Sequence, residues 1–92
     1  MRKNASVTGV QNFDILDLII APNPVQNTFN ISLLSENLVS EITIVNLQGM
    51  VIWNQKTSSQ NIEINTSEWS SGVYIVTVKS GAKISINKII IL

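Results

Sequence analysis

The chain contains neither cysteine nor histidine. Without cysteine it has no thiolate nucleophile and no thiolate metal site, and without histidine it lacks the commonest transition-metal ligand and the side chain that titrates near neutral pH. An enzyme would have to rest on six carboxylates, a few lysines and hydroxyl groups. Because the carboxylates are scattered among expected strands and loops, the sequence predicts no catalytic residue, no metal site and no cofactor.

Charge is also scarce. Charged residues make up 13% of the 92 residues, and six basic side chains balance six acidic ones. A surface without a net field is not expected to attract nucleic acid or an anionic membrane, and no small-molecule substrate is indicated. Apolar residues make up 45%, the opposite of a disordered composition, so one domain with a single modest core is expected.

Long hydrophobic runs are missing as well. No run reaches the length of a membrane-spanning helix, and the basic residues near the start are followed by polar residues instead of the apolar stretch of a secretory signal. If the protein is exported, its leader is expected outside this chain. Residues 1–16 are interpreted as a linker or an expression remnant, and residues 17–92 as the folded domain.

What the sequence has in quantity is period-two alternation of apolar and polar residues, the signature of half-buried strands. It is clearest in residues 28–33, where Phe29, Ile31 and Leu33 share one face. Other strands are expected at residues 13–20, 41–47, 50–54, 61–65, 73–78 and 84–92. The 50–54 strand is apolar on both faces, which predicts a central or covered position. About seven short strands without a helical crossover predict an all-β, Greek-key sandwich.

Specific residues are expected to shape the turns. Gly49 should take a positive φ in a hairpin that Asn46 supports, and Gly72 should be a turn glycine at the start of the next strand. Residues 66–69 are expected to form a helical turn capped by Thr or Ser. The hydroxyl of Tyr74 is expected to reach back to a nearby backbone group, a structural role.

Pro22 and Pro24 flank Asn23 and must end or kink the first strand, because proline cannot donate to a strand ladder. Two interpretations of this segment remain open. It is either a recognition element or a stiff turn that prevents edge pairing.

Trp53 and Trp69 support a rival hypothesis, a carbohydrate-binding or adhesive β-sandwich module, because sugars stack on exposed aromatic faces. Trp53 lies in an apolar strand, and Trp69 lies where a connection could plug the sandwich. Burial against the core is therefore the expected role of each indole. Two indoles exposed on one flat face would favour sugar binding instead.

Several stretches together resemble a known family. They are Pro22-Asn23-Pro24-Val25, Phe29-Asn30-Ile31, Ile44-Val45-Asn46-Leu47-Gln48-Gly49-Met50-Val51, Ser71-Gly72-Val73-Tyr74-Ile75-Val76 and Lys88-Ile89-Ile90. In this order and spacing they resemble the C-terminal sorting domain of proteins carried by the type IX (Por) secretion system. The resemblance covers residues 18–92 and implies an immunoglobulin-like sandwich of about seven antiparallel strands. The family often ends in a basic residue after the apolar pair, whereas this chain continues with Ile91-Leu92.

The resemblance implies a non-catalytic address. The domain would direct an upstream cargo domain from the periplasm across the outer membrane of a Gram-negative bacterium, to the cell surface or the medium. The implied partners are the secretion machinery of the outer membrane and a sortase-like peptidase that removes the domain.

The last five residues, Lys88, Ile89, Ile90, Ile91 and Leu92, are the candidate sorting signal and are termed the tail below. If Ile84 and Ile86 face inward, the alternation continues to Lys88, Ile90 and Leu92 and turns Lys88 toward the apolar core, unless a bulge shifts the register. Lys88 is then either a structural residue that snorkels at the rim of the sandwich or part of a recognised tail. The hypothesis is that the tail is weakly held, presents unpaired backbone groups and is captured by strand addition by a receptor. Deleting residues 89–92 is then expected to block export of a fused reporter while leaving the sandwich folded. A sheet edge this poor in charge also predicts self-association through edge strands.

Overall fold

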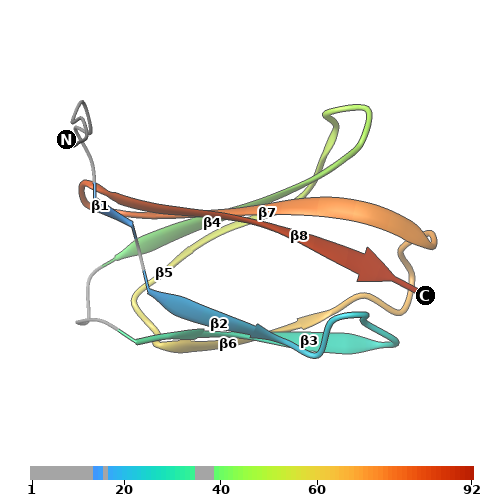
Figure 1. Ribbon diagram of the computed structural model, residues 1–92, viewed down its shortest axis with the longest axis horizontal. Coiled ribbons are helices and arrows are strands. Elements are labelled where there is room, and N and C mark those ends of the chain that lie inside the picture. The colour runs from blue at the N-terminus through green and yellow to red at the C-terminus, as the bar shows by residue number, and fades with distance from the viewer. Residues whose placement is uncertain (1–13, 16, 35–38) are drawn as a thin grey trace, which may run out of the picture.

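The computed structural model describes residues 14–15, 17–34 and 39–92, which form only strands, turns and loops (Figure 1). The strands are β1 (Asp14–Ile15), β2 (Leu18–Ala21), β3 (Thr28–Leu33), β4 (Ser40–Asn46), β5 (Val51–Thr57), β6 (Asn61–Asn65), β7 (Gly72–Ser80) and β8 (Lys83–Ile91). Within these residues, no helix is present that is long and apolar enough to span a membrane.

The strands form two sheets that face each other as two layers (Figure 1). One sheet has the order β1-β8-β7-β4-β5 and the other has the order β2-β3-β6. Neighbouring strands are antiparallel except for the two-residue β1, which is parallel to β8. Because β3 pairs with β6 and β4 with β7, the connections cross between sheets in Greek-key fashion. The expected all-β sandwich is confirmed.

The core lies between the two inner faces, where the expected alternation is also confirmed. Phe29 and Ile31 of β3 are fully buried, and Leu33 nearly so. Directly opposite on β6, Ile64 pairs with Phe29, and both side chains point into the same layer. The remaining buried apolar residues are Val25, Ile42, Ile44, Ile62, Tyr74, Val76, Val78, Ile89 and Ile91. Burial of this set provides most of the driving force for folding.

The segment expected as one strand, residues 13–20, is divided between the sheets. Residues 14–15 pair with β8, whereas residues 18–21 pair with β3. Residues 13 and 16 lie outside the described part of the chain. The segment runs along one side of the sandwich. Its first part lies at the edge of one sheet beside β8, and its second part lies at the edge of the other sheet beside β3.

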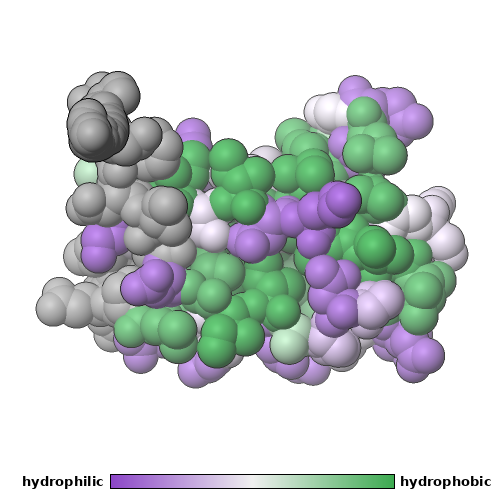
Figure 2. Space-filling model, viewed as in Figure 1, coloured by the Kyte–Doolittle hydropathy of each residue, from purple (hydrophilic) through white to green (hydrophobic). Residues whose placement is uncertain are grey.

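The expectation that residues 50–54 form a central or covered strand is wrong. Within the described residues β5 is an edge strand with β4 as its neighbour, and Met50 and Val51 are more than half exposed. Trp53, opposite the buried Ile44, is partly buried against the core. In this protein, apolar residues on both faces of a strand therefore do not indicate that both faces are buried. Other apolar side chains also lie exposed on the outside of the sandwich (Figure 2).

The expected orientation of the last strand is also wrong. Ile89 is fully buried and Ile91 is 3% exposed, whereas Ile86 is 66% exposed and Lys88 points to solvent. The register with β7 runs without a shift from the hairpin to Ile91, so no bulge changes the alternation. The error arose because β8 carries isoleucines on both faces, and its inward positions near the hairpin are polar. The charge of Lys88 therefore stays in solvent and needs no buried partner.

Residues 66–69 form a single hydrogen-bonded turn instead of a helical one. The N–H of Trp69 donates to the carbonyl of Thr66 at 2.9 Å. The cap is Asn65, whose side-chain oxygen accepts from the N–H of Ser67 at 2.8 Å. The Thr66 hydroxyl instead donates to the carbonyl of Asn27 at 3.1 Å, just beyond the paired ends of β3 and β6, which ties this turn to the β2–β3 connection.

Candidate functional site

The residues that the sequence singled out lie at one end of the sandwich. The β4–β5 turn, the β6–β7 connection, the β2–β3 connection and the C-terminus all lie at the right-hand end in Figure 1. Strand register connects them: Tyr74 lies opposite Asn46 on one side and Ile89 on the other, and Gly72 lies opposite Ile91. Segments that are far apart in the sequence thus build one site around the tail.

The tail is part of the core through its inward residues. Ile89 and Ile91 project between the sheets, and β7 pairs with both along one side of β8. Ile90 and Leu92 project outward and are 41% and 62% exposed, and Lys88 is exposed as well. One face of the tail is thus structural, and the other is accessible to a partner.

On the side of β8 away from β7, residues 22–25 lie along the tail. The N–H of Ile90 donates to the side-chain oxygen of Asn23 at 3.0 Å, and the side-chain nitrogen of Asn23 donates to the carbonyl of Lys88 at 3.1 Å. The N–H of Val25 donates to the carbonyl of Ile90 at 2.7 Å, and the N–H of Leu92 donates to the carbonyl of Val25 at 2.9 Å. The tail is therefore paired along both of its edges.

This pairing contradicts the expectation of a weakly held tail. Two of its five side chains are core residues, and its backbone is bonded to β7 and to residues 22–25. The sequence offered the proline-flanked Asn23 and the tail as separate features, and it gave no role to Val25. Asn23 and Lys88 are 65 residues apart in the sequence, and the fold brings them together by placing the β2–β3 connection beside β8.

The turn at Gly49 is built as expected. Gly49 has a φ of 84°, in the left-handed region that favours glycine. The side-chain oxygen of Asn46 accepts from the N–H groups of Gln48 and Met50, each at 3.0 Å. Asn46 therefore supports the turn that connects β4 to β5 beside the site.

The expected role of Tyr74 is confirmed. Its hydroxyl donates to the carbonyl of Ser70 at 2.6 Å, and its ring lies 5.4 Å from that of Trp69 at an interplanar angle of 43°. Gly72, between them in sequence, has a φ of 150°, a conformation rare for other residues. These contacts fix the connection that leads into β7, next to Ile89 and Ile91.

The two tryptophans do not form a sugar-stacking platform. Trp69 is partly buried and lines a hollow of about 510 Å³ with Glu68, Ser70 and Tyr74, whereas Trp53 lies on β5 and is not part of that lining. Both indoles pack against the core, as expected. The arrangement that would favour the carbohydrate-binding alternative is therefore not found.

Replacing Tyr74 with Phe should lower the free energy of unfolding by about 1 kcal/mol, because it removes one short, partly buried hydrogen bond and leaves the ring in place. Urea denaturation of both proteins measures the difference. A Thr77→Val variant of the same strand, at a position on the opposite face, should be close to neutral. An unchanged midpoint for Tyr74→Phe would show that the Ser70 contact does not stabilise the fold.

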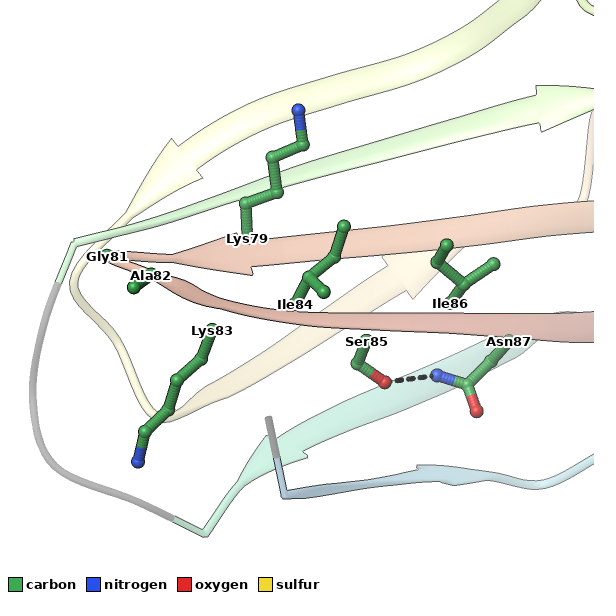
Figure 3. A pocket seen from close by; sticks show the side chains of 8 residues that line it. All are labelled: Lys79, Gly81, Ala82, Lys83, Ile84, Ser85, Ile86 and Asn87. Atoms are coloured by element: carbon green, nitrogen blue, oxygen red, sulfur yellow. Dashed lines mark hydrogen bonds between the residues drawn. The ribbon is translucent and has the colours of Figure 1, made fainter. Parts of the chain in front are cut away.

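Two other surface hollows are lined by residues that the structure describes. One, of about 410 Å³, adjoins the tail and is lined by Leu92 together with Pro22, Pro24, Gln26, Asn27 and Thr28. The other, of about 610 Å³, lies at the β7–β8 hairpin (Figure 3). There Lys79, Ile84 and Ile86 point to one side of the strands and Ser85 and Asn87 to the other, with Asn87 donating to Ser85 at 2.7 Å. Of these two hollows, the first contains residues of the candidate site, namely Pro22, Pro24 and Leu92.

Comparison with known proteins identifies the domain. The model of the family described as the secretion system C-terminal sorting domain matches residues 19–92. The chain belongs to this family. An ulvan lyase of Nonlabens ulvanivorans is 36% identical over 76 residues, which are 80% of this chain and 14% of that protein.

A solved structure has the same fold. It is that of PorZ, an essential bacterial surface component of the type IX secretion system of Porphyromonas gingivalis, with a TM-score of 0.68 and 17% identity. The match covers 82% of this chain and 11% of PorZ. The chain thus spans a small part of the proteins it matches.

Membership of the family establishes the function of the domain. It is a C-terminal sorting domain that directs export by the type IX secretion system, to the cell surface or the extracellular space. As such it is a signal domain and not a catalytic one.

Proposed function

We propose that the tail is the part of this sorting domain that the secretion machinery reads, through the outward side chains of Lys88, Ile90 and Leu92. The observation that carries the proposal is the division of the tail: its inward isoleucines are committed to the core, whereas its outward side chains are exposed. A cation next to two apolar groups on the outward face of the strand offers a receptor both charge and apolar contacts to recognise. Pro22, Pro24 and the hollow beside Leu92 extend this surface.

We further propose that the domain comprises residues 17–92, that residues 1–16 form a linker whose end docks on the sandwich through the pairing of β1 with β8, and that a larger cargo domain precedes them. The small share of the ulvan lyase that matches supports a longer protein of this kind. A sortase-like peptidase would cut in the linker before β1, so that the sandwich is removed as a unit. The activity of the whole protein would then reside in the cargo.

The test fuses residues 17–92 to a periplasmic reporter in a bacterium with a type IX secretion system and in the same strain without its outer-membrane pore. The reporter should reach the surface only in the first strain. Changing Lys88, Ile90 and Leu92 together to Ser should abolish surface delivery while the circular dichroism spectrum stays that of a folded sandwich, because all three side chains point outward.

The matched control changes Leu47 and Met50 to Ser. These residues are 69% and 62% exposed in the β4–β5 turn at the same end of the sandwich, so the control removes a similar apolar surface away from the tail. Delivery should stay at the wild-type level. If the triple tail variant is delivered as efficiently as the wild type, the address lies elsewhere in the domain.

A further inference from the structure

Residues 23 and 25 together form two rungs of a parallel ladder along β8. In a parallel pair, a residue donates to the carbonyl that precedes its partner and accepts from the N–H that follows it. The backbone of Val25 does this opposite Ile91, with the carbonyl of Ile90 and the N–H of Leu92. The side-chain amide of Asn23 does the same opposite Ile89, with the carbonyl of Lys88 and the N–H of Ile90.

The second rung is made by a side chain and not by the backbone. Residues 22–24 form bends instead of a strand, and the side chain of Asn23 reaches the groups of β8 that a strand backbone would otherwise bond. The carboxamide of asparagine has the same donor and acceptor as a peptide group, so it can replace one. Unlike a backbone rung, it is exposed and can rotate away without moving the chain.

We propose that residues 22–25 are a latch on the tail, with Asn23 as the positioning residue that opens first. Once the latch moves aside, the outer edge of β8 at Lys88 and Ile90 offers its N–H and C=O groups to an extended segment of a partner protein, which adds as a new strand. Ile89 and Ile91 stay in the core through their pairing with β7, so the cost of opening is the burial of Val25, which is fully buried in the closed state. This inference rests on the proposed role of the tail and specifies how the tail becomes accessible.

Amide hydrogen exchange tests the latch in the isolated domain. In Asn23→Ala, the N–H of Ile90 loses its acceptor and should exchange at least about tenfold faster, as expected for a hydrogen bond replaced by solvent. The N–H of the buried Val76 should exchange at the wild-type rate, which shows that the sandwich is intact. Asn30→Ala, a change of an exposed asparagine on β3, should leave the Ile90 rate unchanged. An unchanged rate in Asn23→Ala would overturn the latch.

A disulfide tests whether opening is required. Val25 and Ile91 are register partners. The Cα atoms of such a pair are about 5 Å apart, a separation that suits a disulfide. Because the natural chain has no cysteine, the two introduced residues can pair only with each other within the domain. The reporter fusion that carries Val25→Cys and Ile91→Cys should be folded when oxidised, but the amount delivered to the surface should fall at least about tenfold. A partner that binds by strand addition cannot displace a covalently linked segment. The two single variants should be delivered.

Delivery of the oxidised double variant at the wild-type level would overturn the latch. So would loss of delivery in a folded Asn23→Ala variant, since the receptor would then read Asn23 itself. Failure of the proposed function looks different. In that case the triple tail variant is delivered normally, whatever the state of the latch.

Discussion

Deleting residues 89–92 should unfold the domain, with loss of its cooperative urea transition. The deletion removes Ile89 and Ile91, which are buried between the sheets, together with the pairing that holds residues 22–25. Loss of each large aliphatic core side chain costs about 2–5 kcal/mol. Two such losses are of the same size as the whole stability of a domain this small, about 5–15 kcal/mol. Far-ultraviolet circular dichroism during urea titration measures the effect.

The control keeps the length of the chain and changes only the outward face. Ile90→Ser with Leu92→Ser should retain a cooperative transition within about 1 kcal/mol of the wild type, since partly exposed side chains contribute little when replaced. A truncated domain that still unfolds cooperatively at the wild-type midpoint would show that the tail is dispensable for folding. Blocked export after the same truncation would not identify a signal, because an unfolded domain is also expected to fail.

The elements predicted correctly are those in which apolar and polar residues alternate. In β3, Phe29, Ile31 and Leu33 alternate with polar residues, so only one orientation buries the apolar face. Turn chemistry is equally local: Asn46 and Gly49 suffice to specify their hairpin. Such features depend on residues close in sequence, and the sequence therefore contains all the information needed to predict them.

The errors concern β5 and β8, where both faces are apolar. Periodicity cannot choose an orientation for such strands, and the choice is made by tertiary pairing. In β8 the bond to β7 places Ile89 beside Tyr74 and turns Lys88 outward. In β5 the same ambiguity led to the prediction of a central or covered strand, whereas β5 lies at the edge of its sheet.

The site was predicted in pieces and not as an assembly. The proline-flanked Asn23 and the tail were both identified, but their contact joins residues 65 and 67 positions apart. Local patterns carry no information about which distant segments meet. The role of an asparagine side chain as a ladder rung becomes visible only when the strand it completes is placed beside it.

Introducing lysine at two neighbouring tail positions should separate the structural face of the tail from its recognition face. Ile89→Lys places an ammonium group in a fully buried position and removes a core side chain, which should destabilise the domain by at least about 4 kcal/mol and leave it largely unfolded. Ile90→Lys adds the same charge at a position that is 41% exposed and should change the free energy of unfolding by about 1 kcal/mol or less.

The two variants have the same composition, so differences in net charge cannot explain a difference in behaviour. Urea denaturation measures stability, and the reporter fusion measures delivery. If the outward face is read, Ile90→Lys should be folded yet poorly delivered, because the lysine removes the apolar group between Lys88 and Leu92 and adds a second cation. Equal loss of stability in both variants would contradict the alternation of β8, and full delivery of Ile90→Lys would move recognition away from the centre of the tail.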